Sequence, residues 1–282
     1  MGTLYLVATP IGNLEDVTAR ALRVLREVSL IAAEDTRHTG RLLKHFGIET
    51  PLLSYHAHNE RARRDRLLAA LAEGDVALVS DAGTPGISDP GYDLIRAALA
   101  AGYPVSPVPG PSALIAGVTA SGLVPGPFVA LGFLPRKGPE RQATLARAGA
   151  TGFPIALFEA PNRLVATLEE LAATLGEREA AVGRELTKLH EEVRRGTLSQ
   201  LAQHYREQPP KGEVVVVVGG GPGQDAADAV DAADVVARLL AAGMGPSQAA
   251  KEAAAITGRP RSDLYDLARR LRQPERATPP SS

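Results

Sequence analysis

Three loops rich in glycine and proline carry polar side chains that could hold a small charged molecule. The densest runs from Val79 to Gly91 and includes Asp81, Thr84 and Asp89 among three glycines and two prolines. Glycine widens and proline narrows the conformations open to the backbone, so this segment encodes a particular chain path. It leaves an apolar run and enters a helical pattern, which is where open α/β sheets bind ligands. Helix capping would explain Asp89 but not the whole segment.

Two shorter loops repeat this arrangement. One runs from Val108 to Ala113 and turns through Pro-Gly-Pro into a helix that opens at a serine; the other runs from Thr9 to Leu14. Free N–H groups at such a helix start can hold a carboxylate or hydroxyl. Because the carboxyl ends of parallel strands meet at one edge of a sheet, the sequence predicts one site rather than three. Gly219 to Gln224 departs from the dinucleotide-binding pattern at its last position and is interpreted as a linker.

Titratable side chains form clusters after other predicted strands. Glu34 to His38 and Ser54 to Glu60 should lie at the same edge as the three loops. His56 and His58 could bind a metal, but their spacing is a weak signal, and no metal site is predicted. In the second half of the chain, polar clusters occupy Glu159 to Arg163 after a strand, Arg184 to Glu192 in a hairpin, and a basic loop from Phe133 to Arg141.

Lysine is rare among the basic residues of this chain. Five of the 31 are lysine, and Lys137 and Lys188 stand within polar clusters. Lysine can lose its proton in a site where arginine cannot, so these two are candidate functional residues. The alternative is that they are ordinary surface lysines.

Composition excludes several kinds of chemistry. The chain has 282 residues, a formal net charge of −1 and no cysteine. Disulfides, cysteine-ligated zinc, iron–sulfur clusters and thiolate catalysis are therefore ruled out. No apolar run approaches the roughly 18 residues of a spanning helix, and no signal peptide pattern opens the chain. We expect a cytoplasmic, soluble protein.

The pattern of apolar runs predicts an α/β protein of two domains followed by a small helical one. Residues 1–112 alternate five short strands with four helices, which is typical of a doubly wound parallel sheet. Residues 113–224 combine strands and helices with a predicted antiparallel pair between Ala180 and Thr197, so a mixed sheet is expected. The predicted strands are Thr3–Ala8, Val28–Ala33, Leu52–Tyr55, Val76–Ser80, Pro104–Val108, Phe128–Gly132, Phe153–Phe158, Ala180–Leu186, Glu192–Thr197 and Val214–Val218.

Residues 225–282 are predicted to form an acidic linker, a basic helical domain and a frayed tail. From Arg238 onward the chain contains seven Arg and one Lys but two Asp and two Glu, which gives a local net charge of +4. Three helices are predicted, at Asp231–Ala242, Ser247–Thr257 and Arg261–Arg272. A basic helical unit is compatible with contact to nucleic acid, although the same charge could be a solvated helix face.

Six segments together resemble the bacterial ribosomal RNA small subunit methyltransferase I family. That family belongs to the tetrapyrrole methylase, or class III, group of S-adenosylmethionine-dependent methyltransferases. The matching segments are Leu4–Asp16, Glu34–Thr39, Ser54–Glu60, Ser80–Gly91, Pro109–Ala113 and Phe158–Arg163. Tetrapyrrole members carry Gly-Asp-Pro where this chain has Gly83-Thr84-Pro85, and this departure disfavours a porphyrin-like substrate.

The resemblance implies 2′-O-methylation of a cytidine ribose in the decoding region of 16S rRNA, within the small ribosomal subunit. It implies a homodimer and S-adenosylmethionine as cofactor, bound in a cleft between two α/β domains. Carried over by motif, the cofactor-binding residues are Pro10, Asp81, Gly83, Thr84, Ile87, Ser112, Ala113, Glu159, Ala160 and Leu186.

A ribose hydroxyl is a poor nucleophile, so its methylation should use a base or an electrostatic aid. Our hypothesis is that Asp35, His56 or Glu185 accepts the proton and that Lys188 stabilises the forming alkoxide. The substrate RNA would be held by the basic residues Arg37, Arg136, Lys137 and Arg163. Two alternatives remain: a class III methylase for a small molecule or a protein side chain, and a ribosome-binding or assembly protein without catalysis.

Overall fold

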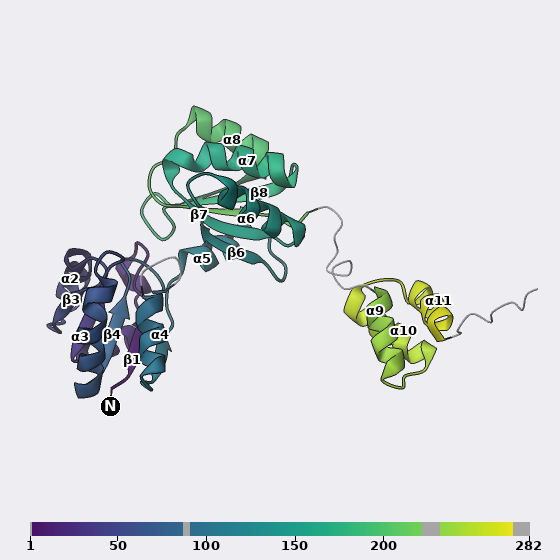
Figure 1. The fold of residues 1–282 in the computed structure, drawn as a ribbon. Coiled ribbons are helices and arrows are strands. Elements are labelled where there is room, and N and C mark those ends of the chain that lie inside the picture. Colours follow the sequence, from purple (N-terminus) through teal and green to yellow (C-terminus); the bar gives the residue numbers. More distant parts are fainter. Residues whose placement is uncertain (1, 87–90, 222–231, 273–282) are drawn as a thin grey trace, which may run out of the picture.

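The computed structural model describes residues 2–86, 91–221 and 232–272. Two five-stranded sheets, each covered by helices, are followed by three further helices (Figure 1). The predicted fold class, two α/β domains with a C-terminal helical domain, is confirmed. The predicted limits of these domains stay predictions. None of the helices in the described ranges combines the length and apolar character that crossing a membrane requires.

The first sheet is parallel throughout and has the strand order β3-β2-β4-β1-β5. Its short strands are apolar because helices cover both faces of the sheet. Buried side chains of α1 and α2 pack on one face, and those of α3 and α4 pack on the other. The elements are β1 (Leu4–Val7), α1 (Ala19–Glu27), β2 (Leu30–Ala33), α2 (Thr36–His45), β3 (Leu52–Ser54), α3 (Glu60–Glu73), β4 (Val76–Val79), α4 (Tyr92–Ala100) and β5 (Val105–Val108), with a short 3-10 helix, η1 (Leu14–Asp16), after β1.

The second sheet is mixed, with the order β6-β7-β10-β8-β9. β6 and β7 are parallel, whereas β10 runs antiparallel to both β7 and β8, and β8 pairs antiparallel with β9 as predicted. The elements are α5 (Ala113–Ser121), β6 (Val129–Phe133), α6 (Pro139–Ala150), β7 (Ile155–Glu159), η2 (Pro161–Arg163), α7 (Leu164–Leu175), β8 (Glu179–Arg184), β9 (Glu192–Thr197), α8 (Leu198–Glu207) and β10 (Val214–Val218).

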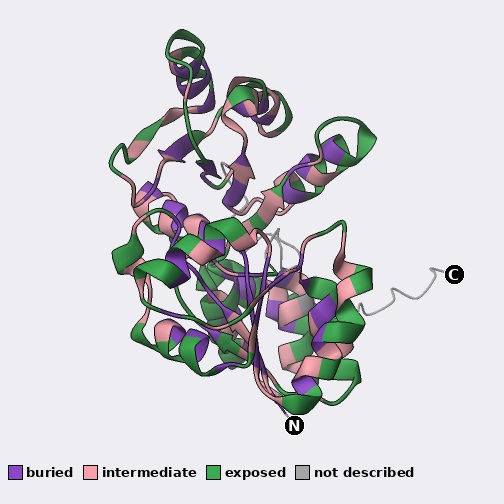
Figure 2. Cartoon of the chain, turned by 90° about the vertical axis from the view of Figure 1, so that its left-hand side faces the viewer, coloured by how far each residue is buried: buried purple, intermediate pink, exposed green. Residues whose placement is uncertain are grey.

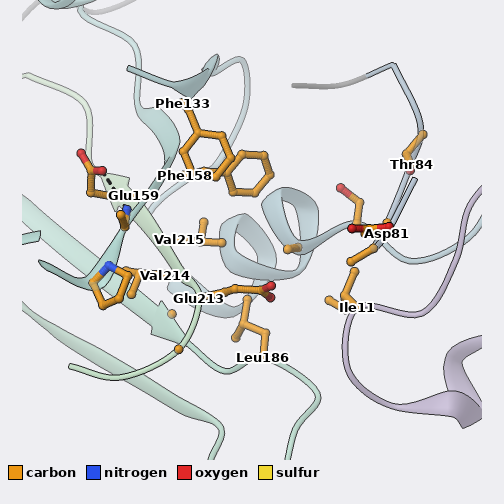
Figure 3. A pocket seen from close by; sticks show the side chains of 18 of the residues that line it. Ile11, Asp81, Thr84, Phe133, Phe158, Glu159, Leu186, Glu213, Val214 and Val215 are labelled. Carbon is orange, nitrogen blue, oxygen red and sulfur yellow. Dashed lines mark hydrogen bonds between the residues drawn. The ribbon is translucent and has the colours of Figure 1, made fainter. Parts of the chain in front are cut away.

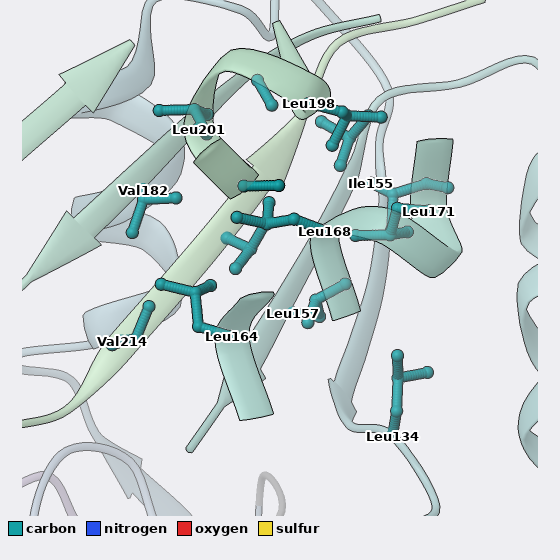
Figure 4. Close-up of a cluster of buried hydrophobic side chains, with 14 of the residues drawn as sticks. Leu134, Ile155, Leu157, Leu164, Leu168, Leu171, Val182, Leu198, Leu201 and Val214 are labelled. Atoms are coloured by element: carbon teal, nitrogen blue, oxygen red, sulfur yellow. The ribbon is translucent and has the colours of Figure 1, made fainter. Parts of the chain in front are cut away.

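Strand β10 consists of five valines, all of them buried. Side chains alternate between the faces of a strand. Val214, Val216 and Val218 accordingly join the cluster under α6, α7 and α8, and Val215 and Val217 join the cluster under α5. Figure 4 shows Val214 among the leucines of the first of these clusters. Figure 2 shows the same layering, with the strands largely buried and the outer turns of the helices exposed. A continuous apolar run was therefore the correct signal for a central strand.

The two α/β parts meet through a loop of the first and a helix of the second. Ile11, which follows β1, is buried in the same cluster as Leu114 of α5 and Leu186 after β8. Within α5, a Cβ added at Gly117 would lie 2.6 Å from Val215 Cγ1, so only glycine lets this helix approach the sheet so closely. The Ile11 contact thus holds the loop after β1 against α5, and the Gly117 contact holds α5 close to β10.

The last three helices form a unit with its own core. They are α9 (Ala232–Ala241), α10 (Pro246–Thr257) and α11 (Arg261–Arg272). Small and aliphatic side chains from all three, among them Val236, Ala250 and Leu264, are buried against one another. The predicted acidic linker up to Asp231 and the tail beyond Arg272 lie outside the described residues.

One helix was not predicted. The sequence indicates a basic loop from Phe133 to Arg141, but α6 already begins at Pro139. Proline is well suited to the first turn of a helix, where its missing N–H group has no partner to lose. Gly138, which caps α6, has φ of 94° and supplies the turn before it.

The close approach of α5 to β10 can be tested by filling it. We expect Gly117→Ala to lower the free energy of unfolding by about 1–3 kcal/mol, because an extra methyl in a packed core forces neighbouring atoms to move. Val215→Ala in the same chain should recover part of this loss. Urea denaturation gives the values, and Gly126→Ala is the control because no atom lies within 4 Å of the added Cβ. Equal effects at Gly117 and Gly126 would contradict the packing argument.

Candidate active site

A cavity of about 400 Å³ lies between the two α/β parts of the chain. Ile11, Asp81 and Thr84 face it from the first part, and Phe133, Phe158 and Leu186 face it from the second (Figure 3). Its lining residues are Ile11, Glu34, Asp81, Ala82, Gly83, Thr84, Ser112, Ala113, Phe133, Phe158, Glu159, Ala160, Pro161, Gly183, Leu186, Gly212, Glu213, Val214 and Val215. Clefts between domains are common ligand sites.

The three glycine- and proline-rich loops meet at this cavity. Thr9 and Gly83 exchange two backbone hydrogen bonds, of 2.9 and 3.0 Å, which join the loops after β1 and β4. The Thr84 hydroxyl donates to the Pro111 carbonyl at 3.4 Å and ties in the loop after β5. Gly83 has φ of 79°, a conformation that side chains disfavour, which explains a glycine at this point. The three loops therefore line one cavity, as the sequence predicts, and their role in binding a ligand stays a prediction.

The wall from the second sheet is apolar and partly aromatic. The Phe133 and Phe158 rings lie 5.2 Å apart between centroids, with 39° between their planes. Phe133 is 55% exposed, an unusual fraction for a large apolar side chain beside a cavity. Aromatic faces of this kind can stack on a planar heterocycle.

The opposite wall carries carboxylates. The Asp81 N–H donates to Glu34 Oε2 at 3.4 Å, and the Asp35 N–H donates to Asp81 Oδ1 at 2.9 Å. Burial raises the pKa of Glu34, and the negative charge of Asp81 raises it further, against smaller opposing effects of the Asp81 N–H and His56. A carboxylate with a raised pKa at a cavity wall is a candidate proton acceptor.

Most of the predicted cofactor residues line the cavity. Those that do are Asp81, Gly83, Thr84, Ser112, Ala113, Glu159, Ala160 and Leu186. Pro10 does not, although its neighbour Ile11 does, and Ile87 lies outside the described residues. Ser112 caps α5 by accepting from the Ile115 N–H. The binding roles of these residues stay predictions.

The four predicted catalytic residues lie next to the cavity lining rather than in it. Asp35 caps α2 and forms an ion pair with the exposed Arg37 at 2.8 Å. This bonding holds the pKa of Asp35 well below its usual range. His56 is 3.1 Å from Asn59 through Nε2, and its buried Nδ1 has no hydrogen-bond partner among the described residues. His56 also interacts electrostatically with Glu34.

Glu185 and Lys188 belong to a network at the other side of the cleft. Lys188 Nζ donates to Glu185 Oε1 at 2.9 Å and to Glu213 Oε2 at 3.2 Å, and Glu213 lines the cavity. The bond from Lys188 lowers the pKa of Glu185. Lys188 also lies against the first α/β part, since a Cβ added at Gly12 would be 2.3 Å from its Cγ. Glu185 and Thr187 have φ of 49° and 67°, so this loop holds a strained path.

Glu159 is buried at the boundary between this cavity and a second one. Its carboxylate accepts from the Ala160 N–H at 2.7 Å and from the Thr167 hydroxyl at 2.6 Å, and it pairs with Arg163 at 2.5 Å and Arg141 at 3.8 Å. The second cavity, of about 330 Å³, is lined by the predicted RNA-binding residues Arg136, Lys137 and Arg163 together with Arg141. Arg37, the fourth predicted RNA contact, does not line this cavity and lies in the first turn of α2.

Some lining residues had not been predicted. Glu34 stands beside the predicted Asp35, but adjacent side chains after a strand point in different directions, and the sequence does not say which faces the cavity. Phe133 and Phe158 end neighbouring parallel strands, a relation that appears only once strand order is known. Glu213 directly precedes the valine strand β10, and this position beside a predicted strand was the signal in the sequence that could have identified it.

Family comparisons match nearly the whole chain. The model of the Tetrapyrrole (Corrin/Porphyrin) Methylases matches residues 3–202, and that of the RsmI C-terminal HTH domain matches residues 226–272. Proteins named ribosomal RNA small subunit methyltransferase I are similar throughout. The one from Synechocystis sp. is 50% identical, covering 96% of this chain and 99% of its own, and that from Pseudomonas aeruginosa is 47% identical, covering 95% and 96%.

Solved structures share the fold at low identity. The methyltransferase CobJ has a TM-score of 0.60 with 21% identity, over 78% of this chain and 95% of its own. Uroporphyrin-III C-methyl transferase from Thermus thermophilus, complexed with S-adenyl homocysteine, has a TM-score of 0.56 with 21% identity, over 77% and 97%.

The buried pairing of Glu159 predicts a large effect on stability. Arg141→Ala should lower the free energy of unfolding by about 3–5 kcal/mol, because it removes a partner of a fully buried carboxylate. Arg147→Ala, at an exposed position of the same helix, should change it by less than about 0.5 kcal/mol. Adding Glu159→Gln to the Arg141 variant should restore stability in part, and no recovery in urea denaturation would count against the buried charge as the cause.

Proposed function

Because the chain belongs to the tetrapyrrole methylase family, we propose that it transfers a methyl group from S-adenosylmethionine to a cytidine 2′-hydroxyl in the decoding region of 16S rRNA, within the small ribosomal subunit. The near-complete similarity to proteins named ribosomal RNA small subunit methyltransferase I carries this proposal. The family model of the C-terminal domain supports it at the other end of the chain. Work on ribosomal subunits would place the protein in the cytoplasm, and the homodimer stays a prediction.

The cavity between the two sheets fits S-adenosylmethionine by its chemistry. A planar adenine suits the aromatic and aliphatic wall of Phe133, Phe158 and Leu186. A carboxylate group suits the start of α5 at Ser112 and Ala113, where N–H groups are free of helical partners. The cationic sulfonium and amine suit a cavity that carries Glu34 and Asp81. When bound, this cofactor supplies a methyl group bonded to a positively charged sulfur.

The chain must position the ribose hydroxyl, exclude water and accept a proton. Holding two reacting groups at attack distance is itself a large rate effect, and the facing loops of the two α/β parts are suited to it. We infer that Glu34 takes the hydroxyl proton, because its carboxylate lines the cavity and has a raised pKa. His56 beside Glu34 would favour the carboxylate form. Lys188, which donates to the cavity-lining Glu213, remains our candidate for stabilising the alkoxide.

The decisive experiment is label transfer followed by mapping of ribose methyl groups. Purified small subunits carrying unmodified rRNA, and naked 16S rRNA, are incubated with the protein and labelled S-adenosylmethionine. We expect one methylated cytidine ribose in the subunit. Labelling of neither substrate, with cofactor binding intact, would redirect the search to small molecules or proteins, and absence of cofactor binding by calorimetry would favour a non-catalytic assembly protein.

Glu34→Gln should separate activity from stability. We expect the single-turnover rate to fall about 10²- to 10⁴-fold through loss of the base. Because folding raises the pKa of Glu34, ionisation of this carboxylate lowers the stability of the folded chain as the pH rises through that pKa. The variant should therefore unfold at a higher temperature than the parent chain at pH 8, with the difference shrinking toward pH 4.

The wild-type rate should also decline as Glu34 becomes protonated at low pH. A variant that keeps its rate would exclude Glu34 as the base, whatever its stability.

Deleting residues 226–282 tests the role of the basic helical unit. We expect the shortened chain to bind S-adenosylhomocysteine normally, because α9–α11 have a separate core and contribute no residue to the lining of the cavity. Methylation of the small subunit should fall at least tenfold, since three arginines in the last turn of α11 would be lost. Unchanged methylation of the subunit would contradict a role of α9–α11 in docking it.

A further inference from the structure

The second cavity has an unusual balance of charge. It is lined by the loop before α6, the first turn of α6, Arg163 and the first half of α7, and it contains four cationic side chains. One lining carboxylate, Glu170, and the adjoining Glu159 oppose them. Two positive charges are therefore left without a matching negative charge at this place.

Arg141 is fully occupied by the protein itself. It is 7% exposed and donates to Glu170 at 2.5 Å, to the Pro135 carbonyl at 3.1 Å and to the Thr167 hydroxyl at 2.8 Å. Its guanidinium therefore holds the cavity walls together and has little capacity for a ligand. One of the four cations of the cavity is therefore held in a fixed position.

Three other cations have free donors. Arg136 and Lys137 are exposed and form no ion pair or side-chain hydrogen bond within the described ranges. Arg163 pairs with Glu159 through Nη2, whereas its Nη1 is buried and has no acceptor among the residues that the structure describes. A buried donor without an acceptor is costly, so the protein itself does not fully satisfy this guanidinium.

The start of α6 adds to the same positive field. Pro139, the first residue of this 12-residue helix, has no N–H, and the Arg141 N–H donates to the Gly138 carbonyl at 3.2 Å. The remaining positive field at this end is that of the helix dipole, which favours an anion there. The cap residue Gly138 itself lines the cavity, so the helix end and the free cations face a common space.

We infer that this second cavity binds a backbone phosphodiester of the RNA substrate. The inference rests on the proposed function and deepens it. Arginine forks and N–H groups match the oxygens of a phosphate. The lining includes no aromatic side chain that could stack on a base, which favours a backbone phosphate over a nucleotide held by its base. Recognition here is therefore independent of sequence and serves to position the strand.

The buried Glu159 carboxylate connects this phosphate site with the first cavity. Glu159 and Ala160 line the first cavity, and the same carboxylate fixes Arg163 in the second. A strand held at Arg136, Lys137 and Arg163 is thus kept in a fixed relation to the place where the methyl group is transferred. Arg163 makes this connection, because it pairs with Glu159 and also lines the second cavity.

The test measures binding to small subunits carrying unmodified rRNA, as a function of salt. For the double variant Arg136→Gln/Lys137→Gln we expect about tenfold weaker binding at 0.1 M salt. The slope of log K against log salt should shrink by roughly 0.7, the value for one lost phosphate contact. Arg147→Gln, on the exposed far end of α6, is the matched control and should change neither value. Calorimetry with S-adenosylhomocysteine should give parent-like affinity for both.

Each outcome bears on a separate statement. If the parent chain binds subunits and the double variant has an unchanged slope, the phosphate site is excluded while the proposed function stands. If the parent chain neither binds nor methylates subunits, the proposed function fails. Calorimetry with inorganic phosphate provides a second reading: binding that the double variant loses, together with an unchanged slope on subunits, would assign the cavity to a small phosphorylated molecule and overturn the RNA assignment.

Discussion

The arrangement of both cavities depends on one carboxylate that water does not reach. Glu159 ends β7, and its oxygens are bonded to the Ala160 N–H, the Thr167 hydroxyl and two arginines from different helical segments. A buried charge is tolerated only when its partners are complete, so each of these groups constrains the others. The end of β7, the start of α7 and the first turn of α6 consequently have one arrangement. The walls of the two cavities are formed by these same segments.

A second constraint acts across the cleft between the sheets. Ile11 is buried among side chains of α5 and the loop after β8, and Gly12 lies against the aliphatic part of Lys188. The close packing of Gly117 on Val215 holds α5 between the two sheets. The first α/β part thus reaches the second through the neighbouring residues Ile11 and Gly12. This explains how loops distant in sequence can line one cavity with little freedom between them.

The sequence predicted features that depend on neighbouring residues in the chain. It did not predict features that depend on the order of strands in a sheet. Glycine and proline loops, helix caps such as Ser112 and the valine strand predicted the sheets and part of the first cavity's lining. The basic segment up to Arg141 has the composition of a loop, and the alanines, glycine and threonine of α6 give this helix only a weak amphipathic pattern. The choice between Glu34 and Asp35 required knowing which side chain faces the cavity. The pairing of Phe133 with Phe158 required knowing that β6 and β7 are neighbours.

The position of β10 has a consequence for how the chain is made. It is the last strand in sequence, yet it lies between β7 and β8 rather than at an edge. While the ribosome is still adding residues before Val214, β7 and β8 therefore have no partner on their inner sides, and their backbone groups are open to other pairings. Val214 and Val215 also line the first cavity. The nascent chain consequently lacks part of the wall of the first cavity until this strand inserts.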